Sequence, residues 1–117
     1  MRRGQICFVN FDGKGTEIQG PHPAIVIHIL PRVNLAIVIP LTTNLEVLEK
    51  YPLTHLIRAT GQSGLNHDSV AEVFHIRSCH LSRFSRNNSG DVVTLGEIST
   101  VEKRIINDLI KSEIQFS

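Results

Sequence analysis

The chain of 117 residues has little aromatic character: it has no tryptophan, one tyrosine and five phenylalanines. Proteins that hold single-stranded nucleic acid by base stacking need aromatic rings on their surface. A small core also needs large apolar side chains, so the few aromatic rings are expected to be buried rather than exposed. We therefore expect Phe11, Phe74 and Phe84 to lie in the core, which leaves little room for a stacking surface.

Cysteine is also scarce, and the two that occur, Cys7 and Cys79, are far apart in the sequence. This excludes a CxxC metal site and a disulfide framework, and it fits a chain that folds in a reducing cytoplasm. The six histidines do not form a recognisable set of metal ligands. His22 and His28, if they shared one strand face, would be separated by roughly 20 Å. We expect no metal and no cofactor.

Strong charge and long apolar runs are missing as well. The formal net charge is +1, so no dominant field indicates a nucleic-acid or membrane surface as partner. The longest apolar run, residues 24–30, contains His28 and is far shorter than the ~20 residues that span a bilayer. The first residues do not have the pattern of a signal peptide. The expected location is cytoplasmic, without membrane contact.

What the chain does have is a hydrophobic content of 41%, enough for a core, and a length typical of one domain covering residues 1–117. Runs of β-branched and apolar residues predict several strands, bounded by Gly, Pro and Asn clusters. The expected strands are residues 5–11, 24–30, 35–41, 53–58 and 69–74. The second and third are expected to form a hairpin, because only a short connection with Pro31 and Asn34 separates them. The prolines at 21 and 23 are expected to lie in a loop before the second strand, and residues 44–52 in a polar loop.

The end of the chain changes its period. Apolar residues at 98, 101, 105 and 109 follow the spacing of an amphipathic helix, and Thr94 with Glu97 has the spacing of a capping box. Residues 80–86 are expected to form a short helical turn. Closely spaced strands followed by one helix predict a mainly β fold: a small, mostly antiparallel barrel with a C-terminal α-helix.

Several stretches together resemble the MazF/PemK family of toxin–antitoxin toxins. They are RRGQICFVNFDGKGTEIQG at the start, PHPAIVI, AIVIPLTT, and GLNHDSVAEVFHIRSCHLSRF, followed by the apolar helix. Each motif is weak alone, but their order and spacing agree over most of the chain. The resemblance implies an SH3-like barrel and a two-fold homodimer. It also implies a metal-independent endoribonuclease that cuts single-stranded mRNA at short sequences and is silenced by a cognate antitoxin protein.

Metal-free RNA cleavage needs a base for the 2′-hydroxyl proton, an acid for the leaving 5′-oxygen, and a group that holds the charge on the phosphate. The resemblance implies that an arginine before the second strand and a threonine after the third perform most of these tasks. The threonine position matches Thr42, whereas the arginine position is occupied by His22. Histidine lacks the planar fork of arginine, but it can give or take a proton near neutral pH. Glu17 matches a loop glutamate and could orient His22 or act as a base. The simpler interpretation is that His22 and Glu17 are polar loop residues and that Thr42 bonds its own backbone.

Contacts to RNA are expected from Lys14, Gln19, Arg32 and Arg58, although scattered surface cations need no special explanation. Some family members use an arginine and an aspartate on a strand near the middle of the chain. Glu72 and Phe74 stand at the corresponding positions, so the sequence does not support that arrangement.

Two alternatives remain open at this point. One is a catalytically impaired MazF-like protein that binds RNA or an antitoxin without cleaving. The other is a CcdB-like gyrase inhibitor, whose fold is similar, although the C-terminal residues do not clearly match that group.

Overall fold

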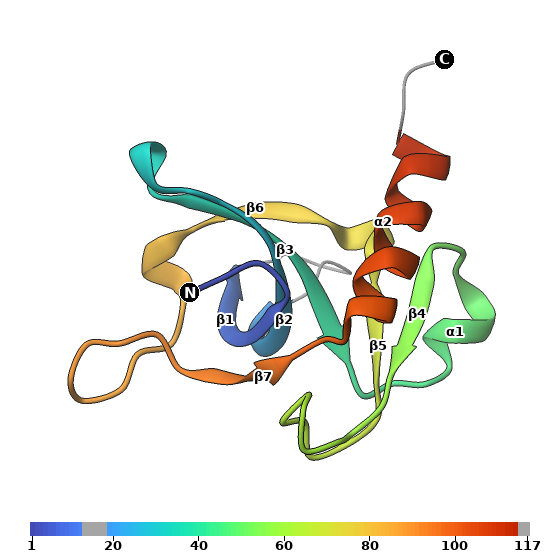
Figure 1. Ribbon diagram of the computed structural model, residues 1–117, viewed down its shortest axis with the longest axis horizontal. Coiled ribbons are helices and arrows are strands. Elements are labelled where there is room, and N and C mark those ends of the chain that lie inside the picture. Colours follow the sequence, from blue (N-terminus) through green and yellow to red (C-terminus); the bar gives the residue numbers. More distant parts are fainter. Residues whose placement is uncertain (13–18, 115–117) are drawn as a thin grey trace.

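The computed structural model describes residues 1–12 and 19–114. The predicted site residues Lys14 and Glu17 lie outside the described residues. Within these described residues, seven strands and two α-helices follow one another (Figure 1). The strands are β1 Gln5–Asp12, β2 Gln19–Leu30, β3 Leu35–Thr42, β4 Thr54–Ile57, β5 Ser69–Glu72, β6 Arg77–His80 and β7 Thr94–Glu97. The helices are α1 Val47–Lys50 and α2 Thr100–Ile114, and the three 3-10 turns are η1 Pro31–Val33, η2 Val73–His75 and η3 Leu81–Arg83.

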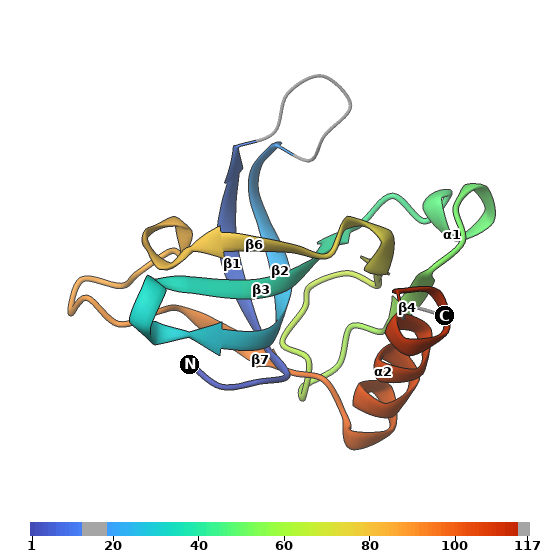
Figure 2. The same ribbon diagram turned by 90° about the horizontal axis from the view of Figure 1, so that it is seen from above.

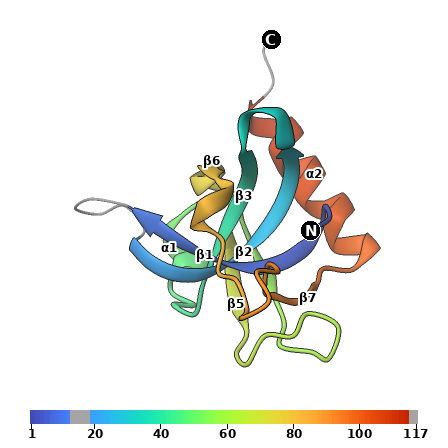
Figure 3. The same cartoon turned by 90° about the vertical axis from the view of Figure 1, so that its left-hand side faces the viewer.

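The strands form one antiparallel sheet in the order β4-β5-β3-β2-β1-β7, with β6 paired to β3 beside β5. The sheet is strongly curled, and α2 lies beside β4 and β5 (Figures 1 to 3). The predicted class, mainly antiparallel β with a C-terminal helix, is confirmed. Strand pairing does not close the barrel within the described residues, because β4 and β7 end the sheet. Instead, the loop after β4 reaches β7, where the Glu97 amide donates to the Gln62 carbonyl oxygen at 2.9 Å.

The predicted hairpin of the second and third strands is confirmed by the pairing of β2 with β3. Its turn begins at Pro31, whose ring fixes φ, and ends at Asn34, which has a left-handed φ of 56°. Asparagine tolerates this conformation better than most residues do. The turn chemistry therefore fixes the register of β2 and β3 next to the turn, up to the irregularity between Val26 and His28.

The start of β2 corrects the sequence prediction, because the strand begins at Gln19 rather than at residue 24. Pro21 and Pro23 pair with β1, whereas pairing with β3 begins only at Ala24. The first residues of β2 thus have one edge without a neighbouring strand, where a residue without an N–H group is tolerated. His22 is consequently a strand residue and not a loop residue.

The core has two parts, on the two faces of the central strands. One contains Ile6, Ile25 and Ile39 together with Ile106 of α2. The other contains the residues that alternate with them, Cys7, Val9, Ala24, Val26, Ala36 and Val38, with Phe11 and Phe84. The core positions predicted for Phe11 and Phe84 are confirmed. Burial raises the pKa of the Cys7 thiol, so Cys7 is a small apolar residue of this core.

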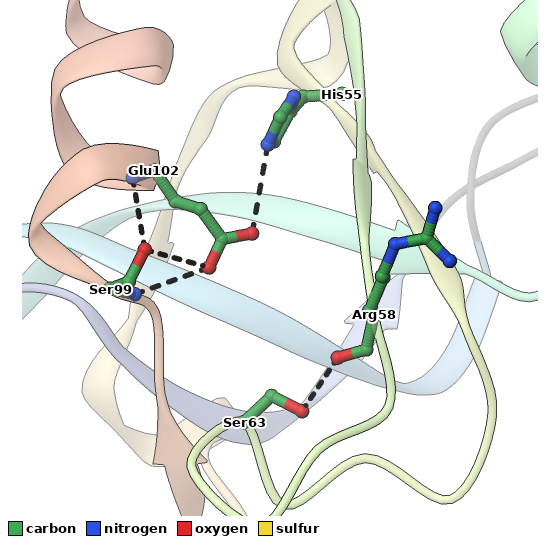
Figure 4. Close-up of polar contacts among 5 residues, drawn as sticks. All are labelled: His55, Arg58, Ser63, Ser99 and Glu102. Carbon is green, nitrogen blue, oxygen red and sulfur yellow. Dashed lines mark hydrogen bonds and ion pairs between the residues drawn. The ribbon is translucent and has the colours of Figure 1, made fainter.

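The C-terminal third differs from prediction in several places. The strand expected at residues 69–74 ends at Glu72 and continues as the turn η2, and β6 and β7 were not expected. Thr94 and Glu97 do not cap the helix, because they belong to β7, which pairs with β1. The cap is Ser99, whose Oγ accepts from the Glu102 amide at 3.1 Å while the Glu102 carboxylate accepts from the Ser99 amide at 3.2 Å (Figure 4).

Helix α2 buries a narrower stripe than its sequence pattern predicts. Ile106 is buried and Leu109 and Ile110 pack partly against the core, whereas Val101 and Ile105 are exposed. Glu102 also links the helix to the sheet, since its Oε2 lies 3.6 Å from Nε2 of His55 on β4 (Figure 4). Neither α2 nor any other helix among residues 1–12 and 19–114 has the length and hydropathy needed to cross a membrane.

Candidate functional site

A cavity of about 540 Å³ lies where β2, the end of β3, α1 and η2 approach one another. It is open to solvent and is lined by polar and aromatic side chains rather than by apolar ones alone. The residues that line it are His22, Thr42, Asn44, Val47, Lys50, Tyr51, Glu72, Phe74 and His75. His22 and Thr42, which were predicted to act together, therefore face the same space.

Sheet pairing explains how these residues meet. Ala24 of β2 lies opposite Pro40 of β3, so continuing that register by two residues brings His22 level with Thr42. On the other side of β3, Thr42 pairs with Val70 of β5, two residues before Glu72. Since residues two apart on a strand share a face, His22, Thr42 and Glu72 belong to one face of the sheet.

His22 has a defined ring orientation. Its Nε2 lies 2.9 Å from the backbone oxygen of Gln19, and its ring centroid lies 6.3 Å from that of Phe11. A carbonyl oxygen only accepts hydrogen bonds, so Nε2 carries the proton and, in the neutral ring, Nδ1 is the basic nitrogen. The neutral form of His22 can therefore accept a proton at Nδ1 without giving up its bond to Gln19.

Thr42 ends β3 and is half-buried. Its Oγ1 accepts a hydrogen bond from the Asn44 amide at 3.2 Å, which is the local backbone contact expected of a threonine at a strand end. That contact uses a lone pair of the oxygen, and the hydroxyl hydrogen remains able to donate. The structural and the chemical interpretations of Thr42 are thus compatible.

Glu72 and His75 line the same cavity, although the sequence did not indicate them. Glu72 is 8% exposed, and burial raises the pKa of its carboxyl. Nε2 of His75 lies 4.0 Å from Oε2 of Glu72. Residues three apart stack on one side of a 3-10 turn, so η2 is what brings this carboxyl and this imidazole together.

An aromatic pair forms another part of the wall. The rings of Tyr51 and Phe74 are stacked, with centroids 4.9 Å apart and planes inclined by 21°. Tyr51 is 50% exposed. The core position predicted for Phe74 is therefore wrong, because its ring faces the cavity. Lys50 is the cavity's one lysine or arginine among the described residues, and its Nζ lies 3.4 Å from the Glu46 carboxylate.

The residues 44–52, expected to be a polar loop, contain the helical turn α1, which carries Lys50 and precedes Tyr51. In Figure 2, α1 and β4 lie at the same end of the molecule as α2. This segment supplies about half of the cavity lining, because Asn44, Val47, Lys50 and Tyr51 all belong to it or flank it.

The remaining predicted RNA contacts are dispersed. Gln19 is exposed at the start of β2 and touches the site through its backbone oxygen. Arg32 lies in η1, at the other end of the β2–β3 hairpin from His22. Arg58 follows β4, and its guanidinium lies 4.0 Å from the Asp68 carboxylate. Arg32 and Arg58 do not line the cavity. No group of three or more metal-ligating side chains occurs among residues 1–12 and 19–114.

The resemblance implies an arginine at the position of His22, and Arg77 does not take the place of that arginine in the cavity. It lies on β6, with its guanidinium carbon 5.8 Å from the centroid of the Phe11 ring, and Phe11 in turn faces His22. The phenyl ring thus neighbours both the guanidinium and the imidazole, and Arg77 does not line the cavity that His22 faces. Arg77 contributes instead to a separate surface hollow with Asp12 and Arg83, which form an ion pair at 2.9 Å.

The fold has several known counterparts. The MazF of Deinococcus radiodurans (form I) has a TM-score of 0.70 and 22% identity, with 94% of this chain and 92% of that chain covered. The Mycobacterium tuberculosis toxin MazF-mt6 has a TM-score of 0.68 and 15% identity, with 92% and 93% covered. The MazE–MazF structure of D. radiodurans (form II) has a TM-score of 0.65 and 20% identity, with 97% and 95% covered.

At these identities, the structural likeness concerns the fold. No curated protein matches the sequence. Residues 2–112 match the family described as the PemK-like, MazF-like toxins of type II toxin–antitoxin systems. Since the match spans nearly the whole of the chain and the fold agrees with it, the chain belongs to the PemK-like, MazF-like toxin family.

Proposed function

We propose that this chain is a sequence-specific, metal-independent endoribonuclease that cuts single-stranded mRNA. The observation that supports this most is the meeting of His22 and Thr42 in one solvent-open cavity, from two different strands. Membership of the family supports this substrate class, and the cavity supplies groups suited to it: an imidazole, a hydroxyl, an ammonium and a stacked aromatic pair. The roles of Glu17 beside His22 and of Lys14, Gln19, Arg32 and Arg58 in binding RNA stay predictions.

The reaction follows from the groups that line the cavity. The ribose 2′-oxygen attacks the adjacent phosphorus, and its proton passes to Nδ1 of neutral His22. The Thr42 hydroxyl and the Lys50 ammonium face the same space and stabilise the charge that develops on the phosphoryl oxygens. The bond from phosphorus to the 5′-oxygen then breaks and that oxygen takes up a proton from an acid, which leaves a 2′,3′-cyclic phosphate and a 5′-hydroxyl. No metal takes part in these steps.

The proposed partners are single-stranded RNA, a cognate antitoxin protein and a second copy of the chain. Two of the similar structures are MazE–MazF assemblies, which supports an antitoxin partner. In this proposal, the tail of the antitoxin covers the cavity and so excludes RNA from His22.

Cleavage of a long single-stranded RNA by the purified protein tests the proposal. EDTA is present throughout, and the pH is varied from 5 to 8. Defined fragments, with a rate that rises and then falls with pH, are the expected result, because one group must be unprotonated and another protonated.

Intact RNA at every pH, from protein that is folded by circular dichroism, would overturn the proposal. The family membership would then point to a protein that binds RNA or antitoxin without cleaving, or to a gyrase inhibitor. Inhibition of DNA supercoiling distinguishes these two.

A further inference from the structure

We propose that His75 is a second catalytic histidine, the general acid that protonates the leaving 5′-oxygen, and that Glu72 is the positioning residue that holds His75 in place for this step. The inference rests on the proposed ribonuclease function and extends it to His75, which the family motif does not indicate, and to Glu72, which stands where some family members carry a different residue. It gives the cleavage reaction an acid as well as the base at His22.

The placement of the two histidines suits the two proton transfers. The strand β3, which carries Thr42, lies between β2 and β5 in the sheet, so His22 and Glu72 flank Thr42 from either side. Where both strands pair with β3, two inter-strand spacings of roughly 10 Å separate β2 from β5, and His22 and His75 line one cavity beyond that point. A phosphodiester between them can therefore meet one imidazole at the attacking oxygen and the other at the leaving oxygen.

The neighbours of His75 favour a proton donor. Its Nε2 lies 4.0 Å from the Glu72 carboxylate, a distance at which a protonated ring is held by charge attraction. Glu72 itself is almost fully buried at the end of β5, where an ionised carboxyl needs a cationic partner. The ring of Phe74 lies 4.6 Å from that of His75 and restricts its rotation. Because burial raises the pKa of Glu72, its carboxyl ionises at a higher pH than a free one and attracts a protonated His75 only above that pH.

The protons balance over one turnover. His22 gains the proton of the 2′-hydroxyl as the bond from the 2′-oxygen to phosphorus forms. His75 loses a ring proton to the 5′-oxygen as the bond from that oxygen to phosphorus breaks. Exchange with water then restores a neutral His22 and a protonated His75.

A substrate with sulfur at the leaving position distinguishes a general acid from a residue that only supports the structure. Two RNAs of identical sequence are compared, one natural and one with sulfur in place of the bridging 5′-oxygen at the scissile phosphate. A thiolate leaves without being protonated, so the sulfur substrate has no need of a general acid. The cleavage rates of the wild type and of His75→Ala, Glu72→Gln and His22→Ala are measured on both RNAs.

His75→Ala is expected to lose about 10²- to 10⁴-fold on the natural RNA and less than about 10-fold on the sulfur RNA. Glu72→Gln is expected to show the same selective rescue with a smaller loss. His22→Ala serves as the comparison, because the base is needed for both substrates and its losses should be equal. Should His75→Ala fail to fold, His75→Gln, which keeps most of the volume, gives the same test.

Equal losses of the His75 variant on the two RNAs, or no loss on the natural RNA, would overturn the role of His75 while leaving the ribonuclease proposal intact. A wild type that cleaves neither RNA would overturn both proposals. The two failures are thus distinguishable in one set of assays.

Discussion

At the residue scale, the main departure from the family pattern is an imidazole where an arginine is implied. Its bond to the Gln19 backbone oxygen determines which nitrogen of His22 is basic. We expect His22→Ala to lower the cleavage rate by about 10²- to 10⁴-fold, because it removes the proposed base for the 2′-hydroxyl proton. The matched control is His67→Ala, an exposed histidine outside this cavity, which should keep the wild-type rate. Near-normal turnover by His22→Ala would remove His22 from the mechanism.

Glu72 predicts a pH dependence of stability. Burial raises the pKa of its carboxyl in the folded protein above the unfolded value. A group of this kind contributes stability that is fully present below its unfolded pKa and is lost as the pH rises through its folded pKa. Glutamine imitates the neutral carboxyl at every pH. Glu72→Gln should therefore gain stability relative to the wild type between pH 4 and pH 8.

Urea denaturation of both proteins at pH 4, 6 and 8 measures this difference. Glu49→Gln, a change at an exposed glutamate of α1, is the control and should show little pH-dependent difference. A Glu72→Gln variant that loses stability relative to the wild type as the pH rises would mean that the ionised carboxylate is stabilised in the fold.

The sequence indicated His22 and Thr42 but not Glu72 and His75, and the reason is geometric. Residues 69–74 were expected to form a strand, and in a strand residues three apart point to opposite faces. The 3-10 turn η2 places the same two residues on one side. The pair could be found only once the end of β5 at Glu72 was known, and nothing in the local pattern marks that end.

At the element scale, the start of α2 shows the same limit. Thr94 with Glu97 and Ser99 with Glu102 have the same capping-box spacing, so the sequence offers two helix starts. Pairing of β7 with β1 assigns the first pair to a strand and leaves the second as the cap. The tertiary pairing of β7 with β1 therefore determines where the helix begins, and the capping-box spacing alone does not.

This choice can be measured. Ser99→Ala should lower the free energy of unfolding by about 1 kcal/mol, because it removes the acceptor of the Glu102 amide. Thr94→Ala is the matched control and should cost less than Ser99→Ala, since Thr94 is exposed on β7 and its hydroxyl makes only a long contact, 3.9 Å, with the Cys7 sulfur. Chemical denaturation of the two variants gives both numbers. The reverse order of the two losses would contradict the observed cap.

The contact between the loop after β4 and the strand β7 depends on two glycines. A Cβ on Gly96 would overlap backbone atoms of Gln62 and Ser63, and one on Gly64 would overlap the Leu95 carbonyl oxygen. Backbone atoms cannot rotate out of the way, so Gly96→Ala should lower the free energy of unfolding by about 2 kcal/mol or more. Gly61→Ala, with nothing within 4 Å of its added Cβ, is the control and should be nearly neutral. Equal stabilities of the two variants would show that this contact does not hold the sheet together.

At the scale of the whole molecule, the class of fold could be predicted from the order of its elements, whereas its closure could not. Strands followed by one helix indicated the antiparallel architecture, and the turn at Pro31 and Asn34 indicated the central hairpin. The gap between β4 and β7 is closed by a backbone hydrogen bond, in which the Glu97 amide donates to the carbonyl oxygen of Gln62 in a loop. A contact between two backbone groups leaves no pattern of side chains in the sequence. The short strands β6, RSCH, and β7, TLGE, were missed for a related reason, since neither contains a run of β-branched or apolar residues and each is defined by its partner.

The proposed homodimer gives a prediction at this scale. Light scattering coupled to gel filtration should give twice the chain mass of 13.1 kDa for the protein alone. His22→Ala should give the same mass, because His22 belongs to the cavity and not to an assembly surface in this proposal. A mass of one chain at micromolar concentration would contradict the homodimer without bearing on the chemistry at His22.

The two-sided core of β1, β2 and β3 has a consequence for the chain before it is folded. Their central residues, such as Ile6 next to Cys7 and Ile25 next to Val26, are apolar toward both faces, so neither face alone is suited to water. A partly folded molecule that has formed the hairpin but has not docked α2 thus exposes apolar side chains and unpaired strand edges, which can bind other chains. Aggregation competes with folding in proportion to concentration, so refolding yield should fall as the protein concentration rises. The completed fold limits this hazard, because the strands that end its sheet, β4 and β7, have only four residues each.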